Sequence, residues 1–225
     1  MEKVLKLYKN LGETPLECLE RFRAENSEYA DQKMTYAGRL DPMAEGLLVA
    51  LVGEECKKKD DYLGLDKEYI FEVLFGFQSD SYDILGIPKN SEKKDFDIKN
   101  FVGKRIQEYP PYSSRTFEKA RSGEEFEAPT KEVEIYSLEK IEEREISAGT
   151  ALAEISRRVS LVKGDFRQEE ILNTWNDLLS GSSENFKVAT FKVACSSGTY
   201  VRSIANEMSG LAYSIHRMRV GEYKI

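Results

Sequence analysis

Histidine, cysteine and tryptophan are scarce in this sequence of 225 residues. It contains one His, three Cys and one Trp. The cysteines Cys18, Cys56 and Cys195 are far apart and odd in number, so they show neither a disulfide framework nor the spacing of metal ligands. A metal site is therefore not expected, and a reducing compartment, the cytoplasm, is the expected location.

Long hydrophobic runs are also missing. The longest, residues 47–52, is far shorter than the ~20 residues that a helix needs to cross a bilayer. Residues 1–8 include Glu2, Lys3 and Lys6 and lack the apolar stretch of a signal peptide. Neither a membrane partner nor a targeting segment is expected.

Basic residues are outnumbered by acidic ones. The 33 Lys and Arg against 40 Asp and Glu give a net charge of −7. A polyanion would then have to bind a locally basic face. We interpret each of the three basic clusters in the sequence as a solvated surface. They are residues 57–59, Arg115 with Lys119 and Arg121, and Arg217 with Arg219.

The spacing of apolar residues predicts a mixture of strands and helices. Residues 46–52 fit either a buried strand or a helix segment. Other strands are expected at residues 4–8, 69–77, 131–141, 151–162 and 186–194. Helices are expected after the capping box of Thr14, Pro15 and Glu17, after Asp165, and from Thr199 to Leu211.

These elements follow one another without the regular alternation of a βαβ protein. We therefore predict an α+β fold, in which a mixed, mostly antiparallel sheet is flanked by helices. Residues 88–130, rich in charge, Pro and Gly, are expected to form an irregular insertion in a single domain that covers residues 1–225. Trp175 is expected in the core, because it shares a helical face with Ile171 and Leu178. The lone His216 is expected to have a structural or surface role.

The stretch AGRLDPMAEG, residues 37–46, carries the first candidate for chemistry. Asp41 lies between a glycine turn and Pro42, so its carboxylate can project from a loop into a cleft. An Asx turn before Pro42 accounts for the same residues. In the next candidate segment, Tyr69 at a strand start is either a core residue or a flat face on which a base stacks.

Two further features concern charge. Asp80 and Asp83 are turn residues, metal ligands or partners of a buried arginine, and without a third ligand at a suitable spacing a metal site is not expected. In CSSGTYVRSI, residues 195–204, a strand leads through small residues into a helix N-terminus. A cation in the first turn opposes the helix dipole, so Arg202 is either solvated or has a specific carboxylate or phosphate partner.

In order and content, these segments resemble the TruB family of pseudouridine synthases. The likeness begins at residues 7–15 and continues to the end of the chain. It includes GRLDPMAEGLL at 38–48, KEY at 67–69, GFQSDSYDILG at 76–86, PPYSS at 110–114, ARSG at 120–123, CSSGTYVRSIA at 195–205 and RMRVGEY at 217–223. So many agreements in one order are not expected by chance.

The resemblance implies roles for individual residues. Asp41 is expected to be the catalytic aspartate, Tyr69 to stack on the flipped base, and Arg202 to pair with the catalytic carboxylate. Asp83 is expected to hold this arginine. The other residues expected near the substrate are Tyr36, Arg39, Leu40, Tyr200, Ser79 and Asp80. Tyr36 stands where the family usually has a His; it can stack and hydrogen-bond but carries no positive charge.

The resemblance also implies a function. It is the isomerisation of uridine to pseudouridine in the T-loop of tRNA, without cofactor or metal, by a monomeric enzyme. The chain ends soon after Gly221, so no C-terminal PUA module is expected. Without this module, and with an acidic net charge, we expect weaker or narrower binding of RNA. Three alternatives stay open: action on ribosomal or another structured RNA, a non-catalytic RNA-binding module of the same fold, and a metal-dependent phosphoester hydrolase that uses Asp80 and Asp83.

Overall fold

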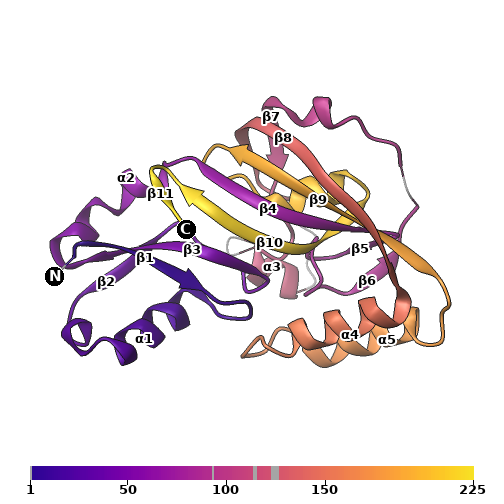
Figure 1. The fold of residues 1–225 in the computed structure, drawn as a ribbon, viewed down its shortest axis with the longest axis horizontal. Helices are drawn as coiled ribbons and strands as arrows, with labels where there is room; N and C mark the ends of the chain where they lie inside the picture. Colours follow the sequence, from indigo (N-terminus) through magenta and orange to yellow (C-terminus); the bar gives the residue numbers. More distant parts are fainter. Residues whose placement is uncertain (1, 93, 114–115, 123–126) are drawn as a thin grey trace.

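A twisted sheet forms the centre of the protein in the computed structural model, which describes residues 2–92, 94–113, 116–122 and 127–225 (Figure 1). Ser114, Arg115 and Gly123, named above in a motif or a cluster, lie outside these residues. Nine strands of the described chain share the sheet. Its path is β1 (Val4–Lys9), β3 (Ala44–Val52), β10 (Gly210–Val220), β4 (Lys67–Phe75), β9 (Asn185–Cys195), β8 (Thr130–Ser147) and β7 (Gly103–Glu108), with β2 (Met34–Ala37) beside β3 and β11 (Tyr223–Lys224) beside β10.

One parallel pair interrupts an otherwise antiparallel sheet. In this pair, Ile215 of β10 lies opposite Ala44 of β3, and Arg217 lies opposite Gly46. The neighbours β4–β10, β4–β9 and β8–β9 are all antiparallel. The predicted α+β class with a mixed, mostly antiparallel sheet is confirmed. The parallel pair has a local consequence, because it sets the start of β3 beside the middle of β10.

Helices cover both faces of the sheet. On one face, α6 (Val201–Glu207) packs against the aromatic residues of β4 and β9. On the other face, α4 (Ala148–Val159) and α5 (Gln168–Leu179) lie side by side (Figure 1). Trp175 of α5 is fully buried and meets Phe77 edge-on, which confirms its predicted place in the core. His216 packs edge-on against Tyr8 of β1, a structural contact.

The first helix, α1 (Pro15–Glu25), packs against β1 and β3. It begins as the sequence predicts: the Thr14 side chain accepts from the backbone N–H of Glu17, and the Glu17 side chain accepts from that of Thr14. This reciprocal capping box satisfies two backbone donors at the helix start.

The structure corrects three expectations. Residues 151–162, predicted as a strand, mostly form α4, because Ala148, Ala151, Ile155 and Val159 recur at helical spacing and are buried together. The expected irregular insertion at 88–130 contains β7, a strand of the main sheet, and also β6 (Pro88–Asn90) and α3 (Phe117–Ser122). The helix expected to reach Leu211 ends at Glu207, where Ser209 adopts a φ of 61° and the chain enters β10.

Residues 46–52, which the pattern left open between strand and helix, belong to β3. Seven of the nine residues of β3 are apolar and buried, because β1 and β10 flank the strand and both of its faces are covered. The short α2 (Lys59–Leu63) follows β3 and returns the chain to β4.

Candidate active site

Asp41 lies in the short loop between β2 and β3. Gly38 opens this loop with a φ of 80°, which favours glycine, and the backbone N–H of Ala44 donates to the Asp41 carbonyl at 3.0 Å. The turn therefore fixes the backbone on both sides of Asp41 before β3 begins. Its side chain stays partly accessible and ion-pairs with Arg202, Oδ2 to Nε at 2.9 Å.

Arg202 comes from the first turn of α6 and is almost completely buried. Its Nη1 donates to the carbonyls of Ser81 at 2.7 Å and Tyr112 at 3.2 Å. The same Nη1 lies 3.5 Å from Oδ2 of Asp83. Burial acts to lower the pKa of Arg202, but the nearby carboxylates of Asp41 and Asp83 raise it by more. The net shift of the pKa is upward, and the guanidinium stays charged.

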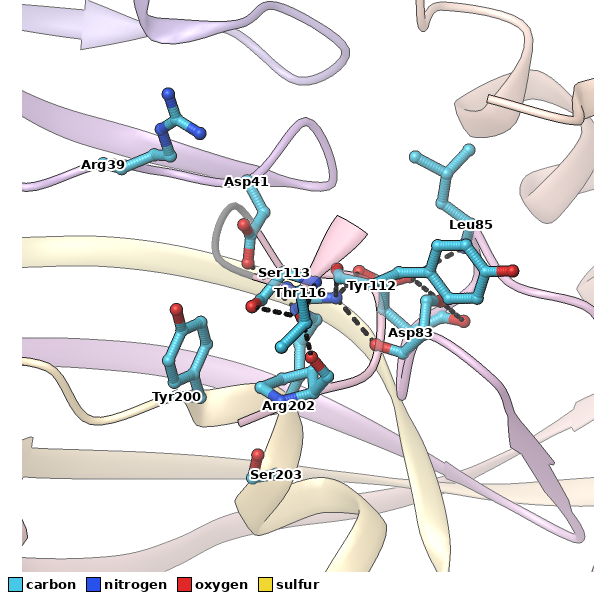
Figure 2. Close-up of polar contacts among 12 residues, drawn as sticks. Arg39, Asp41, Asp83, Leu85, Tyr112, Ser113, Thr116, Tyr200, Arg202 and Ser203 are labelled. Carbon is cyan, nitrogen blue, oxygen red and sulfur yellow. Dashed lines mark hydrogen bonds and ion pairs between the residues drawn. The ribbon is translucent and has the colours of Figure 1, made fainter. Parts of the chain in front are cut away.

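Asp83 lies behind Arg202 and is as deeply buried. Its Oδ1 accepts from the Ser81 hydroxyl at 2.6 Å and from the Leu85 backbone N–H at 3.0 Å. Burial raises the pKa of Asp83 above its ordinary value, while Arg202 and these hydrogen bonds act in the opposite direction. Figure 2 shows Asp83 and Tyr112 on one side of Arg202 and Tyr200 on the other.

Asp80, in contrast, faces a different arginine. Its carboxylate accepts two hydrogen bonds from Arg167, at 2.8 and 3.2 Å. Within the described residues, no group of three or more His, Cys, Asp or Glu side chains is placed to hold a metal ion. Because Asp80 and Asp83 are each engaged by their own arginine, the arrangement does not support the metal-dependent hydrolase.

A cavity of about 360 Å³ opens beside the Asp41–Arg202 pair. Tyr69 of β4 contributes to its wall, and burial raises the pKa of Tyr69 to about 12, so that its phenol stays neutral. Six of the residues singled out in the sequence line the cavity: Arg39, Leu40, Asp41, Tyr69, Tyr200 and Arg202. This size suits a small organic group such as a nucleobase.

Four of the singled-out residues lie outside this wall: Ser79, Asp80, Asp83 and Tyr36. Ser79 is buried, and its hydroxyl donates to the Asp83 carbonyl at 2.6 Å. Asp83 borders a smaller neighbouring cavity, which Asp41 and Arg202 also line. Tyr36 lies on β2, half-buried, with its hydroxyl 3.5 Å from Nη2 of Arg39. The ammonium of Lys59 lies 5.3 Å from the centre of the Tyr36 ring. Tyr36 therefore lies outside the cavity wall, with two cations near its ring, and packs against the hydrophobic cluster that α1, β1 and β3 share.

Arg217 is the important residue that the sequence interpretation missed. It is fully buried rather than solvated, which corrects the interpretation of its cluster. Its guanidinium donates to three carbonyls of the Asp41 loop and β3: Leu47 at 2.7 Å, Gly38 at 3.1 Å and Arg39 at 3.3 Å. The signal in the sequence was its spacing of two from Ile215, which puts both side chains on one face of a strand.

Lys67 is buried beside Arg217 and has a similar task. Its ammonium donates to the carbonyls of Leu63, at 2.9 Å, and Leu65. Burial, with a smaller contribution from Arg217, lowers the pKa of Lys67 to about 8. By comparison, Lys57 and Lys58 are exposed and pair with neighbouring glutamates, as the solvated-surface interpretation predicts.

Solved structures share this fold across nearly the whole chain. An H/ACA RNP bound to a substrate RNA containing 2′-deoxyuridine matches 99% of this chain and 48% of its own, with a TM-score of 0.57 and 16% identity. A Cbf5–Nop10–Gar1 complex matches 99% and 50%, with a TM-score of 0.58 and 17% identity. The chain thus spans about half the length of these solved chains, and at such identities the likeness defines the fold.

The family follows from the sequence comparison. Residues 26–166 match the N-terminal domain of the TruB family pseudouridylate synthases. The chain is 29% identical to the tRNA pseudouridine synthase B of Borreliella afzelii (strain PKo), across 98% of this chain and 70% of that relative. The corresponding protein of Ehrlichia ruminantium (strain Gardel) is 30% identical across 86% of this chain and 58% of its own length. This chain belongs to the TruB family, and its predicted family and enzyme class, the pseudouridine synthases, are confirmed.

In the described part of the chain, none of the helices is long and apolar enough to cross a membrane. The family match begins after α1 and ends just before Arg167, so it includes Asp41, Tyr69 and Asp83 but leaves out Arg202 and Arg217. The structure brings residues from inside and outside the matched region into one site.

Proposed function

We propose that this protein isomerises uridine to pseudouridine in the T-loop of tRNA, without a metal or cofactor, and that Asp41 is the reacting carboxylate. The observation that carries the proposal is the ion pair of Asp41 and Arg202 at a base-sized cavity that Tyr69 also lines. The relatives from Borreliella and Ehrlichia are both named tRNA pseudouridine synthase B, which supports tRNA as the substrate.

The reaction needs a carboxylate beside the sugar of the target nucleotide. The C1′–N1 bond breaks, the base turns, and a C1′–C5 bond forms; C5 loses its proton and N1 gains one. Atoms and electrons balance without an oxidant or a second substrate. In this site, the ion pair holds the Asp41 carboxylate at the cavity, and the carbonyls of Ser81 and Tyr112 hold Arg202 from behind.

Tyr69 suits the task of holding the base. Its neutral ring offers a flat face, and stacking on an aromatic ring contributes about 1–3 kcal/mol per base. This offsets part of the few kcal/mol that it costs to flip the uridine out of its stack, a cost that is lowest in a loop. Leu40, Ala44 and Ile215 add apolar surface to the cavity and help to exclude water from the detached uracil.

Few cations at the cavity are available to phosphates. Arg202 is engaged by carboxylates, and Arg217 and Lys67 by backbone carbonyls. Arg39 is exposed, and Lys131 is half-buried with its ammonium on the carbonyl of Ser197. We assign the phosphate contacts to Arg39 and Lys131; a small number of such contacts fits the net charge of −7. The monomeric state and the cytoplasmic location stay predictions from the sequence.

The test is tritium release from tRNA transcripts that carry C5-labelled uridine, because C5 loses its hydrogen only when it becomes the glycosidic carbon. The proposal expects release from the wild-type transcript and none when the T-loop uridines are replaced by cytidine. Equal release from both transcripts would place the reaction at another uridine. Release from a ribosomal RNA fragment but not from tRNA would overturn the assignment of the substrate.

A further inference from the structure

The connection between β8 and β9 is much longer than the two strands require. They are antiparallel neighbours, and Ser147 at the end of β8 lies opposite Asn185 at the start of β9. Strand ends this close are commonly joined by a two-residue turn. Here the chain instead forms α4 and α5 between them (Figure 1). The family match ends at residue 166, between these two helices.

The loop between α4 and α5 reaches the candidate active site. Its residues Asp165, Phe166 and Arg167 line the cavity of about 60 Å³ that also borders Asp41 and Arg202. The side chain of Gln168 holds the loop in shape: its Nε2 donates to the carbonyls of Gly164 at 2.8 Å and Val162 at 3.0 Å, and its Oε1 accepts from the Phe166 N–H at 2.9 Å. The tip of the helical pair is thus preformed beside the Asp41–Arg202 pair.

Arg167 joins two segments that are far apart in the sequence. Its guanidinium donates twice to the Asp80 carboxylate, at 2.8 and 3.2 Å. The same guanidinium lies 4.0 Å from the centre of the Tyr112 ring, which is a close cation–π contact. Asp80 in turn accepts a hydrogen bond from the backbone N–H of Ile87, so the segment from Asp80 to Ile87 is fixed at both of its ends.

These two partners lead directly to Arg202. Nη1 of Arg202 donates to the carbonyl of Tyr112 and to the carbonyl of Ser81, the residue that follows Asp80. Arg167 therefore fastens both backbone segments whose carbonyls hold Arg202 against Asp41. We propose that Arg167 is a positioning residue for the isomerisation, through which the α4–α5 pair sets the Arg202 guanidinium against the Asp41 carboxylate.

Fold stability alone does not account for this arrangement. The side chains of Arg167 and Asp80 are 27% and 34% exposed, and ion pairs so open to water contribute little to stability. Arg167 has a φ of 62°, a left-handed conformation that is unfavourable for any residue with a Cβ. Strain of this kind persists where the surroundings dictate the conformation, and such residues gather at functional sites.

The inference rests on the proposed function, and its test compares Arg167→Ala and Arg167→Lys with the control Arg157→Ala. Arg157 lies on α4 of the same helical pair, is 58% exposed and pairs only with Glu154 among the described residues. We expect Arg167→Ala to lower kcat about 10- to 100-fold, the effect of a small misplacement of a catalytic group. KM and the melting temperature should stay near the wild-type values, Arg167→Lys should recover part of kcat, and Arg157→Ala should match the wild type.

A lowered melting temperature with unchanged kcat would show that Arg167 is only structural and would overturn the inference. A crystal structure of Arg167→Ala tests the same claim without any activity measurement. We expect the Tyr112 carbonyl to leave hydrogen-bonding distance of Arg202; unchanged contacts of Arg202 would contradict the inference. If the wild-type protein releases no tritium from any RNA, the proposed function fails, and the crystal structure alone decides the role of Arg167.

Discussion

Replacing Arg217 by Met should unfold or loosen the loop that carries Asp41. The change keeps an unbranched, flexible side chain, although a shorter one, and removes all the donors of the guanidinium. The carbonyls of Gly38, Arg39 and Leu47 then lose the guanidinium that they share. A buried acceptor left without a partner costs about 1–3 kcal/mol. Leu47 is completely buried, whereas Gly38 and Arg39 border the cavity and can be reached by water.

The Leu47 carbonyl would bear the full cost of losing its donor, and the carbonyls of Gly38 and Arg39 a part of it. Together these costs lower the free energy of unfolding by about 3–5 kcal/mol. Urea denaturation of the wild type and the variant measures this loss. The matched control is Arg219→Met, two residues further along β10. Arg219 pairs with Glu68 at 2.8 Å with both side chains partly exposed, so we expect at most about 1 kcal/mol there. Equal losses for Arg217→Met and Arg219→Met would refute the reasoning.

The remaining predictions concern a glycine of β3 and a buried lysine. Gly46→Ala should lower the free energy of unfolding by about 3 kcal/mol, since Gly46 has a φ of 106° and a Cβ would lie 2.5 Å from the Arg217 carbonyl oxygen. The control Gly53→Ala should cost about 1 kcal/mol, since Gly53 has a φ of 62° and a Cβ there would meet open space. Equal melting temperatures for the two variants would contradict this prediction. Burial lowers the pKa of Lys9 from 10.5 to about 8, so the penalty for burying its charge is complete below pH 8 and is relieved as the pH rises toward 10.5. Relative to Lys9→Met, the wild type should therefore gain about 2 kcal/mol of stability between pH 7 and pH 10, and parallel pH profiles in urea denaturation would show that the Lys9 pKa is not lowered.

Local patterns in the sequence were enough to predict much of the fold. The capping box at Thr14 and the strand patterns at 69–77 and 186–194 depend on neighbouring residues only. α1, β4 and β9 form at these positions, although β4 ends at Phe75. The strand expected at 151–162 was wrong because Ala151, Ile155 and Val159 fit a helical period, and a short apolar stretch admits both periods. β7 was missed because its exposed Ile106 and its charged residues resemble a loop; its partner β8 makes it a strand.

In the candidate site, too, local patterns predict some features and contacts between distant segments decide the others. Its place in the first turn of a helix left Arg202 either solvated or paired with a specific anion, and the family resemblance implied carboxylate partners. The structure places Asp41 and Asp83 there. The spacing of two from Ile215 places Arg217 on the same face of a strand, but its burial beside the Asp41 loop depends on the parallel pairing of β10 with β3, a contact between residues far apart in the chain. The same holds for Arg167, whose partners Asp80 and Tyr112 come from two other segments.

The central claim is that Asp41 is the reacting carboxylate, and a comparison of wild type with Asp41→Asn in the tritium-release assay tests it most directly. Asn keeps the size of the side chain and removes its charge. We expect tritium release from labelled tRNA by the wild type and none by Asp41→Asn, with tRNA binding and the melting temperature nearly unchanged. Release by Asp41→Asn at the wild-type rate would contradict the assignment of Asp41 and, with it, the mechanism proposed for this site.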